Sequence, residues 1–375
     1  MEKLGFANAW GKSREISWSG TPLGIYLSLN KKCALVDYDL SFNSTENWIY
    51  KALTLTMKYL IGGDFGVLTS IIKQNKLNRL VDSDSYPIIM FDELLTNKLS
   101  YSYVYQDLTV DFLLYIQESK PELLKYTPLS PRIKKRQIDR RKRQTDCFYN
   151  ECKGLFTMSQ FLADFMKKSG VIDTRKIHCV GGGCNIDITR IDCSKKKGNK
   201  FLFVGKDFER KNGPLVVEAF KKVRKRNETL ELYIAGPEKL NANIELSEGI
   251  VFLGLKTYDE LVEYYNMCDY FVMPSRFEAY GIVFAEALIF GLPCIGKNAF
   301  AMPEFIEDGK NGFLIEEDNI DELSNKMIEL TNNNEMSEYV RGEREKYIKK
   351  YSWDAVAERM LAVIETDNKS ARRSF

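Results

Sequence analysis

The 375-residue sequence predicts an α/β fold with two doubly wound, Rossmann-like domains. Short apolar runs alternate with helix-length segments, a pattern typical of parallel sheets covered by helices. The chain is also too long for one core of ordinary size and suits two domains. The strand-like runs form two successive sets. The first comprises 3–7, 33–37, 88–92, 103–107, 154–158 and 177–181, and the second comprises 201–205, 231–236, 250–254, 270–274, 294–297 and 312–315.

Helix signals agree with this division. Pro214 suits the first turn of a helix, Thr257 with Glu260 forms a capping box, and Asn319 with Glu322 is a weaker version of that box. A polar, lysine-rich stretch at 184–200 marks the domain boundary. We therefore expect domains at 1–188 and 189–351. The remaining residues, 352–375, are expected to form an amphipathic helix over 352–365 that packs back on the first domain, followed by a frayed tail.

Composition narrows the class of protein. The 54 Lys and Arg nearly balance the 52 Asp and Glu, which argues against a protein that coats nucleic acid. No run approaches the roughly 18 apolar residues that span a bilayer, and no signal-peptide core is present, so we expect a cytoplasmic protein. Eight cysteines without a C-x-x-C pair and a single histidine indicate reduced thiols and no structural metal site.

The most informative stretch is Pro274 to Pro293, PSRFEAYGIVFAEALIFGLP, in which seven residues separate Glu278 from Glu286. It follows a strand-like run and becomes an apolar helix after Gly281. The unpaired backbone N–H groups at that helix start favour a phosphate, and glycine permits its close approach. The donors are those of Tyr280, Gly281, Ile282 and Val283.

Two loops supply further candidates. Lys206, Arg210 and Lys211 follow the first strand of the second set, where doubly wound folds bind ligands; alone, these cations would be interpreted as a solvated basic loop. Gly20, in SWSGTP, precedes a helix start in the first domain, and an ordinary helix entry explains it equally well. The cations and both glutamates fall on strands expected to be neighbours, which favours a diphosphate site.

The second half resembles the retaining glycosyltransferase family four, whose members have the GT-B fold. The segments that carry the resemblance are VGKDFERKNGPLVVEAF (204–220), FLGLKTYDELVEYYNMCDYFVMPSRFEAYGIVFAEALIFGLPCIG (252–296) and MPEFIEDGKNGFLI (302–315). It covers roughly residues 150–365, with a fainter match before them. It implies two domains facing a cleft, a final helix that crosses to the first domain, and transfer of a sugar from a nucleotide-diphosphate donor to an acceptor hydroxyl with retention of configuration.

The resemblance also implies roles for single residues. Glu286 matches the glutamate that accepts from the ribose, and Glu278 matches the one near the donor sugar. Lys211 matches the phosphate-binding lysine, whereas Lys206 stands where many members have arginine. Arg210 could share that task, so the division among these cations stays open. The remaining donor-site matches are the amides of 280–283 for the distal phosphate, Leu255 and Lys256 for the base, and Gly20 for the phosphates.

The chemistry requires stabilisation of charge on the departing diphosphate, which preorganised cations and a helix start provide. We expect Glu278, Lys211, Arg210 and Asp107 to take part in catalysis. We expect no metal or other cofactor. The partners would be a nucleotide sugar and a glycan or lipid-linked acceptor, without nucleic acid.

Several features leave alternatives open. Many relatives place a histidine near the reacting sugar, but His178 lies in a strand near the boundary and is interpreted as a buried core residue. Asp107 is equally a common turn former. Asp37 and Asp39 form a D-x-D, the metal motif of the other large glycosyltransferase architecture. The basic run 132–143 is a solvated helix face or a contact for anionic lipid.

Three rival functions follow from these alternatives. The first is a sugar-nucleotide epimerase or hydrolase on the same fold. The second is a non-catalytic sugar-nucleotide-binding protein. The third is a lipid- or nucleic-acid-binding module built around 132–143.

Overall fold

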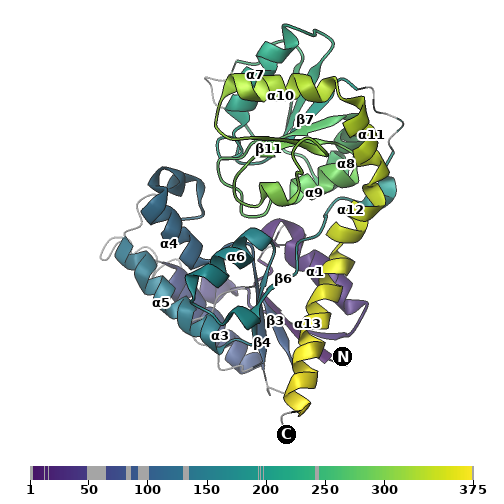
Figure 1. Cartoon of the computed structure of the whole chain (residues 1–375). Coiled ribbons are helices and arrows are strands. Elements are labelled where there is room, and N and C mark those ends of the chain that lie inside the picture. Colours follow the sequence, from purple (N-terminus) through teal and green to yellow (C-terminus); the bar gives the residue numbers. More distant parts are fainter. Residues whose placement is uncertain are drawn as a thin grey trace. The chain divides into compact units, whose positions relative to one another are not determined.

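The chain consists of two compact units. The computed structural model describes residues 3–48 except 12 and 16, 65–81, 86–91, 101–129, 135–192, 194, 196, 198–240 and 245–373. The first unit combines Met1–Gly182 with Trp353–Phe375, and the second comprises Gly183–Ser352 (Figure 1). The boundary between the two units, at 182/183, lies six residues before the boundary at 188/189 that the sequence predicted.

The first unit contains a parallel sheet in the order β2-β1-β3-β4-β5-β6. Its strands are β1 (Lys3–Asn8), β2 (Ala34–Asp39), β3 (Ile88–Met90), β4 (Ser102–Gln106), β5 (Gly154–Thr157) and β6 (Ile177–Cys179). Each coincides with a predicted run, although Asp92 of the run 88–92 lies outside the described residues. Long apolar side chains such as Phe6 and Phe156 are fully buried, as expected for a sheet covered on both faces.

Helices flank this sheet on two sides (Figure 1). They are α1 (Thr21–Asn30), α3 (Phe65–Leu80), α4 (Val110–Ser119), α5 (Lys135–Glu151), α6 (Gln160–Ser169) and α13 (Trp353–Arg373). Side-chain caps start two of them: Thr109 accepts from the N–H of Phe112, and Ser159 accepts from the N–H of Leu162.

Helix α13 packs on α1 within the first unit. The indole of Trp353 lies over Gly24, where an added Cβ would come within 2.3 Å of it. The expected end of this helix at 365 is wrong, because α13 continues to Arg373. Its polar last turns are held by tertiary bonds, such as that from the hydroxyl of Tyr103 to Asp367, at 2.8 Å.

The second unit has the strand order β12-β11-β10-β7-β8-β9, also entirely parallel. The strands are β7 (Lys200–Val204), β8 (Glu231–Ala235), β9 (Ile250–Gly254), β10 (Tyr270–Val272), β11 (Cys294–Lys297) and β12 (Gly312–Ile315). The chain reverses its direction of progress across the sheet between β7 and β10. Doubly wound sheets bind ligands at the carboxyl ends of the strands at such a switch point.

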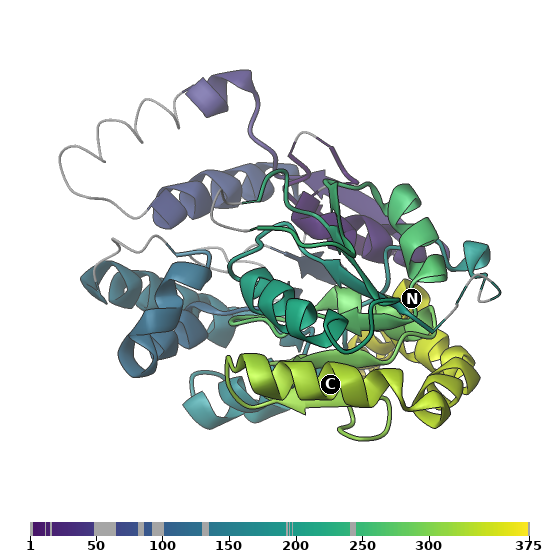
Figure 2. The same cartoon turned by 90° about the horizontal axis from the view of Figure 1, so that it is seen from above.

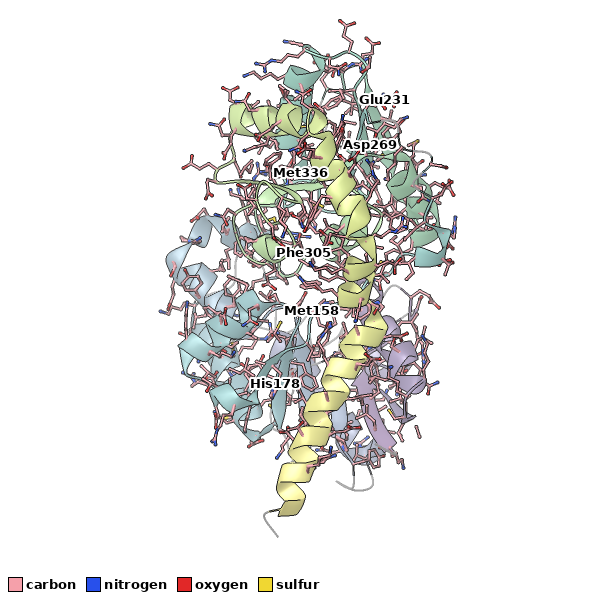
Figure 3. The ribbon with its side chains drawn as sticks, turned by 45° about the vertical axis from the view of Figure 1, so that its right-hand side comes forward. Met158, His178, Glu231, Asp269, Phe305 and Met336 are labelled. Carbon is pink, nitrogen blue, oxygen red and sulfur yellow. The ribbon has the colours of Figure 1, made fainter. Side chains whose placement is uncertain are left out.

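The helices of the second unit are α7 (Gly213–Arg224), α8 (Tyr258–Met267), α9 (Ile282–Ile289), α10 (Ile320–Thr331), α11 (Asn334–Gly342) and α12 (Arg344–Tyr351). Helices α7 and α10 lie side by side (Figures 1 and 2). Phe305, labelled in Figure 3, contacts the rings of Phe284 on α9 and Tyr351 on α12. Among the described helices, none combines the length and the apolar character needed to cross a bilayer.

The capping predictions had different outcomes. The reciprocal box of Thr257 and Glu260 at α8 is confirmed. Asn319 does cap α10, accepting from two backbone N–H groups of its first turn. However, the box with Glu322 is wrong, because that carboxylate accepts from the N–H groups of Glu316 and Glu317 instead.

Candidate functional site

A buried ion pair lies at the carboxyl ends of the adjacent strands β7 and β10. The ammonium of Lys211, from the β7–α7 loop, pairs with the carboxylate of Glu278, from the β10–α9 loop. Both residues are less than a tenth exposed. The sequence predicted that these strands are neighbours, and their pairing through Phe271 and Leu202 brings the two loops together.

Two further groups lie beside the Glu278 carboxylate. The guanidinium of Arg210 lies 3.6 Å from it and donates to the carbonyl of Phe277 at 2.8 Å. The hydroxyl of Ser275 donates to it at 3.3 Å. Burial acts to raise the pKa of Glu278, but the charges of Lys211 and Arg210 outweigh it and hold this pKa below its ordinary value. Glu278 is therefore a carboxylate that faces two cations of the neighbouring β7–α7 loop.

Two glycines allow Lys211 to lie against the strand ends. An added Cβ at Gly205 would come within 2.7 Å of the Lys211 side chain. Gly236 follows β8 with φ of +118°, and an added Cβ there would come within 2.5 Å of the carbonyl carbon of Gly205. A side chain at Gly205 would displace Lys211, and one at Gly236 would displace the backbone of Gly205 against which the lysine lies.

The start of α9 forms the other side of this group. Gly281 precedes the helix with φ of +97° and ψ of 52°, in the left-handed region, and no side chain caps it. Within the first turn the N–H of Phe284 donates to the carbonyl of Gly281 at 2.9 Å, and the helix dipole places partial positive charge at this end. Ile282 and Val283 precede Phe284, and they belong to the backbone stretch 280–283 that the sequence predicted as a phosphate site.

Glu286, about one turn into α9, lies in a different environment. Its side chain is 1% exposed and accepts from the hydroxyl of Tyr265 at 3.0 Å and from the N–H of Asn185 at 3.3 Å. Burial raises the pKa of Glu286 to about 7, against the smaller opposing effects of these two bonds and of Lys211. The two glutamates of one motif thus have pKa shifts of opposite sign.

A pocket of about 620 Å³ opens at the ends of β7, β8 and β9. Lys206 and Leu255, both predicted donor-site residues, line it together with Pro237, and both are exposed. Lys256 lies beside Glu260 at the start of α8, with 3.5 Å between the charged atoms. The fold therefore assembles eleven of the predicted site residues in the second unit.

Gly20 and Asp107 belong to the first unit. Gly20 precedes α1 in the left-handed region, with φ of +81°. Asp107 directly follows β4 and is half-buried. The structure of each unit does not bring these two residues to the group around Lys211.

Two other sequence candidates also lie in the first unit. His178, on β6 (Figure 3), is half-buried, so its interpretation as a buried core residue is wrong. In the D-x-D, Asp37 accepts from the indole of Trp10 at 3.0 Å, and Asp39 accepts from the N–H of Ser41 at 2.8 Å. Across the described part of the chain, no group of three or more His, Cys, Asp or Glu side chains could hold a metal ion.

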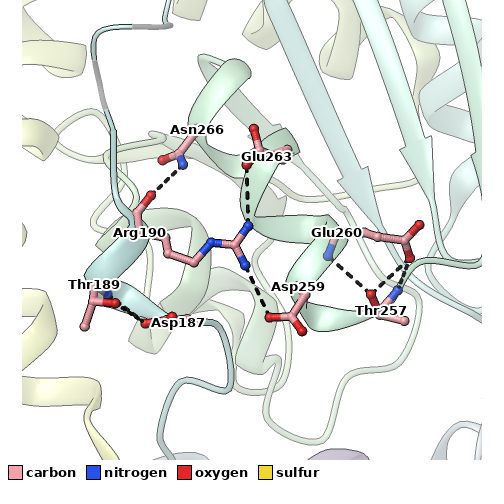
Figure 4. Close-up of polar contacts among 8 residues, drawn as sticks. All are labelled: Asp187, Thr189, Arg190, Thr257, Asp259, Glu260, Glu263 and Asn266. Carbon is pink, nitrogen blue, oxygen red and sulfur yellow. Dashed lines mark hydrogen bonds and ion pairs between the residues drawn. The ribbon is translucent and has the colours of Figure 1, made fainter.

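The segment after Gly183 contributes Asn185, a site residue that the sequence did not reveal. Figure 4 shows that this segment is attached to α8: Arg190 pairs with Asp259 at 3.3 Å and with Glu263 at 3.5 Å, and the carbonyl of Arg190 accepts from Asn266 at 2.8 Å. This attachment positions the N–H of Asn185 on Glu286. The capping box sets the residue at which α8 begins, and therefore which of its side chains face the core. This could have indicated that Tyr265 faces inward and that its buried hydroxyl needs a hydrogen-bond partner.

Comparison with known proteins identifies the class of this fold. The structure of a protein from Anabaena, Alr3699/HepE in complex with UDP and glucose, covers 98% of this chain and 100% of its own, with a TM-score of 0.62 and 13% identity. The match with WaaG, a glycosyltransferase involved in lipopolysaccharide biosynthesis, covers 96% of this chain and 99% of the WaaG chain, with a TM-score of 0.62 and 14% identity. The chain has the GT-B architecture, as the sequence predicted.

A family match lies in the second unit. Residues 187–346, less than half of the chain, match the family model of glycosyl transferases group 1. An uncharacterised glycosyltransferase of Methanocaldococcus jannaschii is 31% identical over 160 residues, which cover 41% of this chain and 44% of the relative. The chain thus matches less than half the length of this curated relative.

Proposed function

We propose that the protein transfers a sugar from a nucleotide-diphosphate donor to an acceptor hydroxyl, with retention of the anomeric configuration. One observation carries this proposal: Lys211 and Arg210 converge with Glu278 beside the start of α9. Cations and the positive end of a helix at one point suit a leaving diphosphate, because they stabilise charge that grows in the transition state. The family match of this unit supports the same reaction class.

The ion pair suggests how the donor is received. Before the donor binds, Lys211 is neutralised by Glu278, and burial lowers the pKa of the lysine. A diphosphate beside α9 would give Lys211 a second anionic partner. Glu278 would then be released to accept hydrogen bonds from the hydroxyls of the donor sugar, while Arg210 continues to hold the loop through the carbonyl of Phe277.

Glu286 would bind the nucleotide ribose, whose hydroxyls donate to its carboxylate. Leu255 and Lys256 would lie along the base, and Lys206 would add charge at the mouth of the pocket. The protein supplies this charge itself, so we propose a reaction without a metal. The Anabaena structure contains UDP, which favours a UDP-sugar as the first donor to test.

The first unit would bind the acceptor, a glycan or a lipid-linked hydroxyl, with Asp107 as the proposed orienting group. A peripheral membrane contact through 132–143 is consistent with a lipid-linked acceptor. The sequence has one histidine, His178, which lies on β6 of the first unit, and this favours the second candidate function, a non-catalytic sugar-nucleotide-binding protein. Turnover distinguishes the two, since that protein would bind donor without consuming it.

The experiment has two parts. Thermal unfolding with UDP-, GDP- and ADP-sugars identifies the donor, since a ligand that binds the folded state raises the melting temperature. Donor consumption is then measured, with and without acceptors, for three variants: Glu278→Gln, Lys211→Ala and Glu286→Ala. We expect Glu278→Gln to lower turnover more than donor affinity, and the other two to weaken donor binding. Removing Lys211 should also slow transfer by about 100-fold or more.

A matched control uses the exposed pair Lys310 and Glu307, at 2.6 Å in the same unit. Lys310→Ala and Glu307→Gln should leave both turnover and affinity unchanged. Near-natural rates in all three site variants would contradict the proposed function. Free sugar formed equally with and without acceptors would instead establish a hydrolase.

A further inference from the structure

Helix α5 carries two opposite stripes of side chains. Ile138, Lys142, Thr145 and Tyr149 follow the spacing of one helix face, and they are buried or half-buried. Four exposed side chains are displaced from this face by two residues along the helix, which turns them by about 200°. They are Arg136, Arg140, Arg143 and Cys147. One face of α5 therefore attaches the helix to its unit, while the other presents three arginines to solvent.

The inner stripe includes a cation that is already neutralised. Lys142 lies 2.9 Å from Asp111 of α4 and 2.6 Å from Asp146. At the start of the helix, Lys135 pairs with Glu118 at 2.5 Å. By contrast, none of the carboxylates in the described ranges forms an ion pair with Arg136, Arg140 or Arg143. These three arginines, together with the half-buried Arg141, are the cations of α5 with charge available to a partner.

We propose that the stripe of Arg136, Arg140 and Arg143 is a docking face for an anionic phospholipid bilayer. The three guanidinium groups extend along about 10 Å of a straight helix, which matches a flat, multivalent surface of phosphates better than it matches one phosphate ion. Helix α5 as a whole has six cations against three carboxylates. Helix α5 lies at the periphery of the first unit in Figure 1. Arg136, Arg140 and Arg143 are all exposed within that unit.

Charge and composition favour lipid over nucleic acid. The whole chain is close to neutral, with a formal charge of +2, whereas nucleic-acid-binding domains are usually strongly basic. The outer stripe contains no aromatic ring on which a base could stack. The attraction is surface electrostatics alone, because no apolar side chain of the stripe could enter the hydrocarbon. Binding should therefore be reversible and sensitive to salt.

The test uses the full chain and sedimentation with vesicles of phosphatidylcholine, with and without phosphatidylglycerol. We expect binding only to the anionic vesicles, weakened by salt. Each arginine near an anionic surface contributes about fivefold in affinity, so R136Q/R140Q/R143Q should reduce binding by about 100-fold. R136K/R140K/R143K keeps the charge and should retain most of the binding. Far-UV circular dichroism and thermal unfolding establish that each variant is folded.

A control triple, K225Q/R226Q/K349Q, removes the same charge from exposed positions in the second unit and should bind as the natural chain does. Four results would overturn the proposal: equal binding by the glutamine triple, an equal loss in the control triple, no binding of the natural chain to anionic vesicles, or comparable salt-sensitive binding to single-stranded RNA. The measurement does not depend on glycosyl transfer, so its failure would leave the proposed reaction intact.

Discussion

Replacement of Glu286 by Gln tests the electrostatics of the site directly. The carboxyl group is 1% exposed, and burial raises its pKa from 4.5 to about 7. This difference corresponds to about 3 kcal/mol between the folded and unfolded chains. Glutamine keeps the shape and can still accept from Tyr265, but it does not titrate.

The sign follows from the protonation states. Well below pH 4.5 the carboxyl group is protonated in both the folded and unfolded chains, and well above pH 7 it is ionised in both. Between these values the unfolded chain ionises first, so the raised pKa makes the free energy of unfolding fall as pH increases. We therefore expect the natural chain to lose about 3 kcal/mol relative to Glu286→Gln between about pH 4 and about pH 8.

Equilibrium unfolding in urea at several pH values measures this difference. Two-unit chains can unfold in two transitions, so the transition that the substitution shifts is the one to compare. A difference between the two proteins that stays constant with pH would refute the raised pKa. Titration calorimetry adds a second readout, because ribose hydroxyls donate to the ionised group. Below pH 7, the affinity of the natural chain for a nucleotide sugar should increase by up to about tenfold for each unit by which the pH is raised. The affinity of the variant should not change with pH in this range.

Three substitutions test the packing that positions these groups. Gly281→Ala forces a side chain into φ of +97°, with its Cβ within 2.9 Å of a ring atom of α9; it should cost about 1–3 kcal/mol in urea unfolding and weaken donor binding. Lys211→Met should cost about 3–5 kcal/mol by leaving Glu278 buried without its closest cation, and a double-mutant cycle with Glu278→Gln should recover part of this loss. Gly24→Val places a side chain against Trp353 and should destabilise the first unit by about 1–3 kcal/mol without changing donor affinity. Retained stability in any of these variants would contradict the packing described for it.

The strands could be predicted because each is a short apolar run, and a sheet covered by helices on both faces requires continuous burial. The end of α13 could not be predicted in this way. Its last turns are polar and lack an apolar stripe, and they stay helical through tertiary bonds such as Tyr103 to Asp367. Local pattern does not encode a bond between residues 264 positions apart.

The candidate site shows the same limit. Lys211, Glu278 and Gly281 could be proposed because loops after adjacent parallel strands meet at one edge of the sheet. Asn185 could not, because it contributes a backbone N–H, which every residue except proline possesses. The attachment of 187–192 to α8 positions the segment that carries this donor.

The two glutamates of the motif illustrate why spacing alone does not assign chemistry. Both are buried, and eight positions separate them, yet Glu278 has a lowered pKa and Glu286 a raised one. The cause is the partner of each carboxylate: two cations on a loop in the first case, a hydroxyl and an amide in the second.

Near neutral pH Glu278 is therefore fully ionised, while Glu286 is divided between its two forms. A ligand that places hydroxyls at Glu286 would favour the ionised form of that carboxyl group. Its diphosphate, placed at Lys211, would separate the ion pair between Lys211 and Glu278. Its binding should accordingly release protons near pH 7, and a nucleotide without the ribose hydroxyls should release fewer.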